Sequence, residues 1–197
     1  GHTRQLNVEA VLALKPTLVL MTAKDTSISV MQKLKNSGVR IVVVDIEETL
    51  DGAYNAAVSL NEILGTSKDL SDLSKEIKAN KQALKDVLAS DTTKPKVLFI
   101  YARGSQMLMV AGKNTFAEYM IELAGGQHLV KEFESFKPLT PEALVQYQPE
   151  VILMFDSGLA SLKTDEAKNT ALEQLFEVPG MAATPAAQNK RVVTMDG

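Results

Sequence analysis

Residues 6–21, LNVEAVLALKPTLVLM, return in altered form as residues 139–154, LTPEALVQYQPEVILM. Matched positions lie 133 residues apart along the whole sixteen-residue stretch, and leucine, glutamate, alanine, proline and methionine recur at matched places. One copy lies near each end of the chain, and no further copies form an array. The repeat therefore indicates two similar lobes rather than a solenoid.

Each copy begins with the signals of a helix N-terminus. Asn7 and Thr140 are good N-cap residues, and Pro141 suits the first helical position, where its missing N–H costs nothing. Glu9 and Glu142 fall in the first turn, where their carboxylates face the positive end of the helix dipole. We therefore predict a short helix at the start of each copy.

Each copy then turns into an apolar run. Pro16 and Pro149 are expected to end the helices, because the residue before a proline resists the helical conformation. Residues 18–21 and 151–154 are continuously apolar, which is typical of a strand buried on both faces of a parallel sheet. Each copy thus predicts a helix, a tight turn and a buried strand.

The chain after the first copy alternates between strand and helix. Residues 27–36 and 50–64 read as helices, and residues 39–44 read as a second buried strand. This alternation is typical of a parallel sheet. Because two strands are too few for a stable sheet between helices, we expect further strands of this lobe before Gly1.

Residues 67–90 place their leucine, isoleucine and valine residues at helical spacing, with lysine and glutamate on the other face. Such a helix would extend roughly 30 Å or more. We interpret it as a rigid strut between two lobes; the alternative is a crossover helix within one sheet. The predicted organisation is an incomplete N-terminal lobe over 1–66, a linker helix over 67–90 and a C-terminal lobe over 91–197.

The C-terminal lobe is the fuller of the two in this sequence. Strands are predicted near residues 96, 150 and 191, and helices over residues 115–124 and 166–176. The stretch between the first of these strands and its helix, ARGSQMLMVAGKNT, is read as a glycine-bearing loop. The predicted fold class is α/β.

Composition excludes several function classes. The net charge of −3 and the lack of a basic run argue against nucleic acid as a partner. The sequence has no cysteine, so it offers no disulfide, thiolate nucleophile or cysteine metal site. It contains no hydrolase elbow, metalloprotease motif or phosphate-cradling loop. We predict a binding protein with its ligand in a cleft between two lobes, not an enzyme.

Several stretches together resemble the periplasmic haem-binding proteins of bacterial ABC importers. The resemblance rests on the opening G-x-x-R-Q-L-x-x-E, the stretch 101–115, the second copy of the repeat, and the segment VPGMAATPA at 178–186 with RVVTMDG at 191–197. The proline–glycine segment is the most specific part. The repeat alone would indicate the broader group that also binds ferric siderophores and cobalamin.

The resemblance implies a class III periplasmic binding protein, with two Rossmann-like lobes joined by a long linker helix. It implies that the protein binds haem as its transported ligand and delivers it to an inner-membrane ABC permease. The protein would be periplasmic or lipid-anchored at the outer face of that membrane, and would continue beyond both ends of this sequence. The alternatives are a ferric siderophore or cobalamin carrier of the same fold and, from another class, a two-domain α/β enzyme.

Two candidate haem-binding residues lie at the start of the chain. His2 occupies the place of the family's axial tyrosine, and imidazole is a competent ligand of haem iron. The alternative is that His2 is an expression remnant or part of a disordered terminus. Arg4 matches the family's arginine that hydrogen-bonds the axial ligand; otherwise it is a surface cation. His2 is thus the predicted metal-binding residue.

The other candidates lie in the second lobe. Arg103 falls near a second histidine ligand of some family members, and its guanidinium fork could hold a haem propionate. Tyr101 either ligates the iron or simply closes the strand. Met107 and Met109 either line the pocket or fill the core. His128 is expected to be a loop or strand-start residue rather than a ligand.

Glu9 and Glu142 also match the family's permease-contacting glutamates. The resemblance implies that both dock the protein onto its transporter. The alternative is that each simply suits a helix N-terminus.

Overall fold

The computed structural model describes residues 6–22, 27–103, 107–155, 173 and 175–195. The chain divides into two compact units, Gly1–Ala79 and Asn80–Gly197. The division falls inside the long helix α4 (Ser71–Leu88). Each unit is described by itself.

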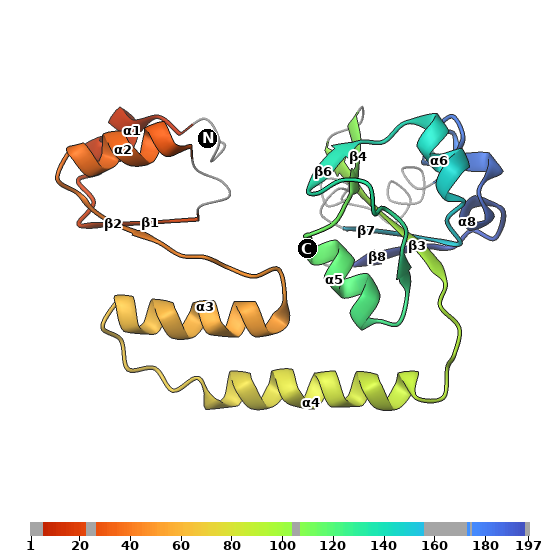
Figure 1. Cartoon of the computed structure of the whole chain (residues 1–197), viewed down its shortest axis with the longest axis horizontal. Coiled ribbons are helices and arrows are strands. Elements are labelled where there is room, and N and C mark those ends of the chain that lie inside the picture. The colour runs from red at the N-terminus through yellow and green to blue at the C-terminus, as the bar shows by residue number, and fades with distance from the viewer. Residues whose placement is uncertain (1–5, 23–26, 104–106, 156–172, 174, 196–197) are drawn as a thin grey trace. The chain divides into compact units, whose positions relative to one another are not determined.

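The first unit carries a small parallel sheet. Its elements are α1 (Val8–Ala13), β1 (Leu18–Met21), α2 (Ile28–Asn36), β2 (Arg40–Val43) and α3 (Leu50–Ile63). Strands β1 and β2 pair in parallel, from Leu18 opposite Arg40 to Met21 opposite Val43. The predicted strand–helix–strand–helix order is confirmed (Figure 1).

The prediction that both strands of this unit are buried on both faces is wrong for the described structure. Leu20 in β1 is 40% exposed and Val43 in β2 is 47% exposed. Each strand has a single hydrogen-bonded neighbour among the described residues. An apolar run becomes fully buried only when strands flank it and helices cover both faces, and this two-stranded sheet provides less cover.

Side chains cap the helix N-termini as the sequence predicts. The Asn7 carboxamide oxygen accepts the N–H of Ala10 at 3.1 Å, and the Thr140 hydroxyl accepts that of Ala143 at 3.2 Å. Pro141 lies in the first turn of α6 (Pro141–Tyr147). These bonds satisfy backbone donors that have no partner inside the helix.

Helix α4 forms within the predicted range 67–90, but none of its residues is buried. Leu73 is 40% exposed and Val87 is 67% exposed. Its apolar stripe is therefore only partly covered, although its helical spacing was predicted correctly.

No described helix combines the length and the apolar character that a membrane span requires.

The second unit is built on a mixed sheet. Its strands are β3 (Lys96–Arg103), β4 (Met107–Ala111), β5 (Gln127–His128), β6 (Phe136–Pro138), β7 (Val151–Phe155) and β8 (Val192–Met195). Their order is β6-β4-β3-β7-β8, and β5 also pairs with β3. Strands β3, β5, β7 and β8 run parallel. Strand β4 pairs antiparallel with both β3 and β6.

The stretch after β3 is a hairpin, not the predicted loop. Strand β4 pairs with β3 from Arg103 opposite Met107 to Ile100 opposite Val110. The loop prediction relied on the glycines of this stretch. At Gly112, however, a side chain would clash with the backbone and ring of Phe133, so this glycine permits a close approach of two segments.

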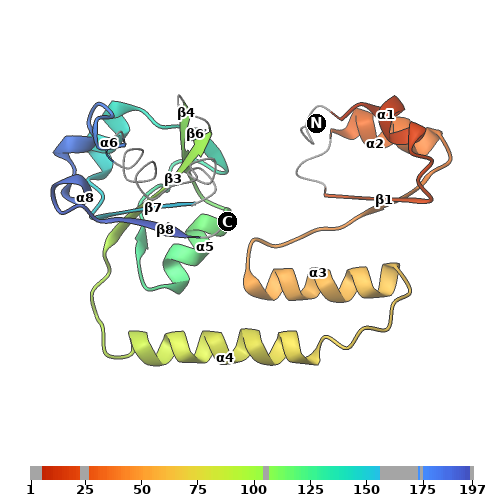
Figure 2. The same ribbon diagram turned by 180° about the vertical axis from the view of Figure 1, so that it is seen from behind.

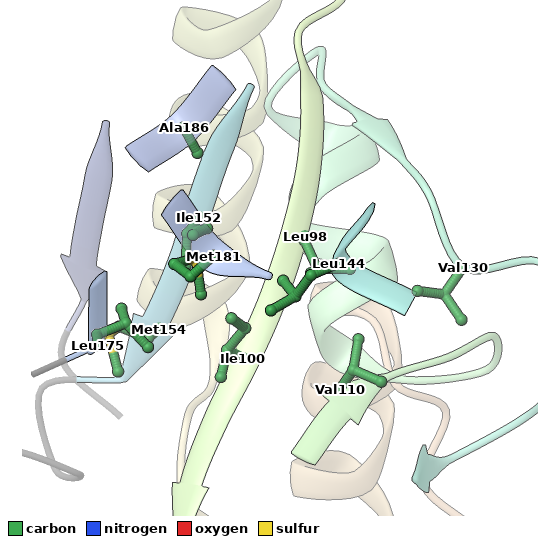
Figure 3. Close-up of a cluster of buried hydrophobic side chains, with 10 residues drawn as sticks. All are labelled: Leu98, Ile100, Val110, Val130, Leu144, Ile152, Met154, Leu175, Met181 and Ala186. Atoms are coloured by element: carbon green, nitrogen blue, oxygen red, sulfur yellow. The ribbon is translucent and has the colours of Figure 1, made fainter. Parts of the chain in front are cut away.

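Helices cover the two faces of this sheet. Helix α5 (Phe116–Leu123) packs on one face, where Ala117 and Ile121 join a buried cluster with Phe99. Helix α6, the short helix η3 (Met181–Ala183) and α8 (Pro185–Gln188) cover the other face (Figure 2). The second cluster includes Leu144 and Met181, both fully buried (Figure 3).

The α/β fold class with parallel-rich sheets is confirmed. The predicted helix over residues 166–176 lies largely outside the described residues.

Candidate functional site

The carboxyl ends of the parallel strands define one edge of the larger sheet. Strands β3 and β7 run side by side from Val97 opposite Val151 to Ile100 opposite Met154. Their last residues, including Tyr101 and Phe155, therefore lie at the same edge. Ligands of parallel α/β sheets generally bind outside the carboxyl ends of the strands, so this edge is the candidate site.

Four aromatic side chains cluster on the α5 face of the sheet and extend toward this edge; they are Phe99, Tyr101, Phe136 and Phe155, called here the aromatic group. The ring centroids of Phe99 and Phe155 are 4.9 Å apart, and those of Tyr101 and Phe136 are 6.2 Å apart. The Phe99–Phe136 and Tyr101–Phe155 pairs are both separated by 6.5 Å. All four contacts are edge-to-face, the geometry that aromatic quadrupoles favour.

The four side chains of the aromatic group differ in solvent exposure. Phe99 is 1% exposed, Tyr101 and Phe155 are half-buried, and Phe136 is 41% exposed. Side-chain alternation along β3 places Phe99 and Tyr101 on one face, and β7 supplies Phe155 beside them. The group thus offers a partly exposed apolar surface, which suits a flat hydrophobic ligand.

Four of the predicted second-lobe residues lie on the paired strands β3 and β4. Tyr101 pairs with Met109 across the hairpin, and Arg103 ends β3 opposite Met107. Met109 is half-buried, whereas the side chains of Arg103 and Met107 lie outside the described residues. His2 and Arg4 also lie outside them. The predicted ligand set therefore stays a prediction.

Three members of the aromatic group were missed in the sequence analysis, and the first, Phe99, lies inside the predicted strand near residue 96. Phe155 directly extends the predicted strand over residues 151–154, so its place at the strand end was available from the sequence. Phe136 belongs to the three-residue strand β6, which has no recognisable periodicity. Its contact with Tyr101 depends on the pairing of β6 with β4.

A polar cluster around His128 also lies on the α5 side of the sheet. His128 is 1% exposed and ends the two-residue strand β5, one residue after the strand start where it was expected. Its Nε2 lies 3.1 Å from the carbonyl oxygen of Ala111, which assigns the proton to Nε2 as the donor. Its Nδ1 faces the carboxylate of Glu118 at 3.6 Å and has no hydrogen-bond partner among the described residues.

Neighbouring charges complete this cluster. Lys131 donates to Glu118 at 3.1 Å and to Glu122 at 2.9 Å, and the bond to Glu122 is the main reason that its pKa is raised. Burial lowers the pKa of His128, although Ala111 and Glu118 oppose that shift. Burial alone would raise the pKa of Glu118, but the Asn114 N–H and Lys131 outweigh it and hold the pKa low. The cluster fixes β5 and α5 rather than offering an open site.

The repeated helices carry the two predicted docking glutamates in matching local geometry. Glu9 and Glu142 are exposed in the first turns of α1 and α6. In both copies the helix is followed by a left-handed residue before the proline, with φ of 49° at Lys15 and 46° at Gln148. The copies therefore share a capped first turn, an exposed carboxylate and an unusual exit turn.

Comparison with known proteins places the chain among binding proteins. The family model described as "Periplasmic binding protein" matches residues 1–197. The solved structure of the periplasmic haem-binding protein RhuT from Roseiflexus sp. RS-1 is 31% identical with a TM-score of 0.80. That comparison covers 98% of this chain and 72% of RhuT.

Two relatives with curated names carry different descriptions. A cobalamin-binding protein of Halobacterium salinarum is 27% identical over 78% of this chain and 41% of its own length. YvrC of Bacillus subtilis, named as an uncharacterised ABC transporter substrate-binding lipoprotein, is 25% identical over 97% of this chain and 58% of its own length. The chain thus spans about half the length of these relatives.

Proposed function

Because the chain belongs to the periplasmic binding protein family, we propose that it is the substrate-binding component of an ABC importer and that its ligand is haem. The observation that carries this proposal is the aromatic group, which extends along one face of the sheet toward the carboxyl ends of β3 and β7. Its support from relatives is the likeness to RhuT, which is named as a haem-binding protein.

The chemistry of haem fits this edge. A porphyrin is a flat ring with apolar faces, and Phe136 and Tyr101 offer partly exposed rings on which such a ring can lie. Burying that surface favours binding at about 25 cal/mol per Å² of apolar area removed from water. Tyr101 also carries a phenol oxygen, a known type of haem-iron ligand.

The remaining candidate residues are assigned roles by the same proposal. His2 ligates the iron, and Arg4 orients that ligand. Arg103 ends the same strand that carries Tyr101 and pairs with a propionate through its guanidinium fork. Tyr101 is the alternative ligand if His2 does not contact the iron.

Delivery requires a membrane partner. We assign Glu9 and Glu142 to docking on an inner-membrane ABC permease, because both carboxylates are exposed and sit in matched first turns. The protein acts in the periplasm or from a lipid anchor at the outer face of the inner membrane. The relative YvrC is named as a lipoprotein, which favours the anchored form.

A second candidate ligand is cobalamin, which the Halobacterium relative is named as binding. Cobalamin also presents a large macrocycle to an aromatic surface, and a ferric siderophore is the third member of this group of ligands. Haem differs from cobalamin in needing an axial ligand from the protein, which His2 or Tyr101 would supply.

A spectroscopic titration tests the proposal. Haemin is added to the protein at its natural length, and to the variants His2→Ala, Tyr101→Phe and Tyr119→Phe. The wild type is expected to give a saturable Soret band. His2→Ala should shift this band if His2 ligates the iron, and Tyr101→Phe should shift it if Tyr101 is the ligand instead. Tyr119→Phe in α5 is the control and should leave it unchanged. An unchanged haemin spectrum on adding wild-type protein would overturn the haem assignment.

A further inference from the structure

Residues 178–191, called here the clamp segment, lie against the repeated helix α6 at its first turn. Gly180 has a φ of 86°, and a Cβ built on it would lie 2.7 Å from the carbonyl oxygen of Pro141. The same Cβ would lie 3.2 Å from the Cα of Pro141. The two backbones therefore touch, and only glycine allows both this approach and this backbone angle.

The clamp segment also holds the turn at the other end of α6. The N–H of Ala186 donates to the carbonyl oxygen of Pro149 at 2.9 Å. Thr184 is fully buried, and its hydroxyl donates to the carbonyl of Met181 at 2.7 Å and accepts the N–H of Ala187 at 3.2 Å. These bonds fix the start of α8 at the turn between α6 and β7.

Between these two points the clamp segment packs into the core beneath α6. Met181 and Leu144 are both fully buried members of one cluster (Figure 3). The short helix η3 contacts α6 directly. Helix α6 is therefore fixed at its first turn, along its buried side and at its exit turn by one continuous segment.

Helix α1 in the first copy is held differently. It contains no buried residue and packs against α2. The helices that carry Glu9 and Glu142 are therefore packed differently, although they are repeats of one another.

We infer that the clamp segment is the positioning element of the transporter contact: Gly180 and Thr184 act through α6 to hold Glu142 in one orientation for the permease. This inference rests on the proposed function. An exposed carboxylate that is already oriented loses less freedom on docking, so its contact with a basic side chain of the permease is stronger. The clamp residues themselves need not touch the permease.

The first test compares two glycines of similar φ within the same unit. Gly180→Ala pushes a methyl group against the Pro141 backbone, whereas Gly125→Ala, at φ 79°, meets the flexible end of Leu88. Both variants carry similar backbone strain. With the protein at its natural length and its permease in lipid nanodiscs, Gly180→Ala should weaken docking by up to about fivefold, the scale of one exposed ion pair. Gly125→Ala should leave docking unchanged.

A double-mutant cycle separates positioning from general damage. If Gly180 acts through Glu142, then Gly180→Ala should weaken docking in the wild type but add nothing in a Glu142→Gln background. Haemin affinity should stay within about twofold in all four proteins, as expected for distant independent sites. Full additivity of the two changes would overturn the inference.

Thr184 supplies a second pair of variants, should Gly180→Ala fail to fold. Thr184→Val removes the hydroxyl at constant shape, and Thr184→Ser restores it; docking should fall in the first and recover in the second. If Thr184→Val and Gly180→Ala dock normally while Glu142→Gln is defective, the positioning role of the clamp segment is wrong, but the docking role of Glu142 stands. Normal docking by Glu142→Gln would overturn the docking role on which the inference rests.

Discussion

The two copies of the repeat have nearly the same local structure and very different surroundings. Strand β7 lies between β3 and β8, whereas β1 pairs with β2 alone among the described strands. Leu144 in α6 is fully buried, but its counterpart Val11 in α1 is only partly buried. The repeated sequence therefore sets caps, helix and exit turn, while neighbouring strands and the clamp segment set burial.

The largest expected difference between the copies lies in their cores. Leu144→Ala should lower the free energy of unfolding by about 2–5 kcal/mol, because it leaves a cavity in a closely packed cluster. Val11→Ala, at the matched position, should cost about 1 kcal/mol or less, because its side chain is already partly hydrated. Urea unfolding followed by circular dichroism measures both. Equal losses would show that the two helices are equally buried.

Acid should act on the second unit through His128. Its folded pKa is lowered from the usual 6.5, so the unfolded chain binds a proton at a higher pH than the folded chain. Stability is then fully present above pH about 6.5 and declines as pH falls from there toward the folded pKa. His128→Gln keeps a donor for Ala111 but does not titrate.

The check on this prediction is the unfolding midpoint between pH 7.5 and pH 5. The slope should be flatter in His128→Gln than in wild type. Glu118, whose pKa is lowered, and Lys131, whose pKa is raised, keep their charges across this range and serve as the common background. Parallel curves would mean that His128 does not contribute.

The two glutamates proposed to dock on the permease should also differ between copies. Glu142→Gln and Glu9→Gln are both expected to reduce uptake through the permease, each by up to about fivefold, without changing haem affinity. The loss should be larger for Glu142, because α6 is fixed by the clamp segment. Glu76→Gln, on the exposed face of α4, is the control. Uptake that survives the double substitution would remove both residues from docking.

The smallest expected effect concerns the exit turns. Lys15→Gly and Gln148→Gly relieve a left-handed backbone conformation and should each stabilise the protein by at most about 1 kcal/mol. The gain should be smaller at Gln148, because its side chain donates to the carbonyl of Val145 at 2.9 Å and that bond would be lost. Differential scanning calorimetry can detect both. Destabilisation by Lys15→Gly would contradict the strain argument.

The sequence predicted what depends on local chemistry. The caps at Asn7 and Thr140, the proline at position 141 and the parallel strands followed from short-range patterns. The exposure of Leu20 did not follow, because burial depends on which strands flank β1. The β3–β4 hairpin was missed because its glycine signalled a loop instead of a close packing contact with Phe133.

The candidate site was predicted in part. The resemblance pointed to Tyr101, but its contact with Phe136 comes from a strand too short to recognise in the sequence. The approach of Gly180 to Pro141 joins residues that are distant in the chain, and no local pattern encodes it. The family resemblance singled out the proline–glycine segment, and the structure shows that it packs against α6.

We propose that this binding protein carries haem and not another macrocycle. The most direct measurement is a competition titration, in which haemin, cobalamin and a ferric siderophore are each added to the protein at its natural length. We expect a saturable Soret band with haemin that neither competitor displaces at equal concentration. Displacement of haemin by equimolar cobalamin, or binding of cobalamin alone, would contradict it.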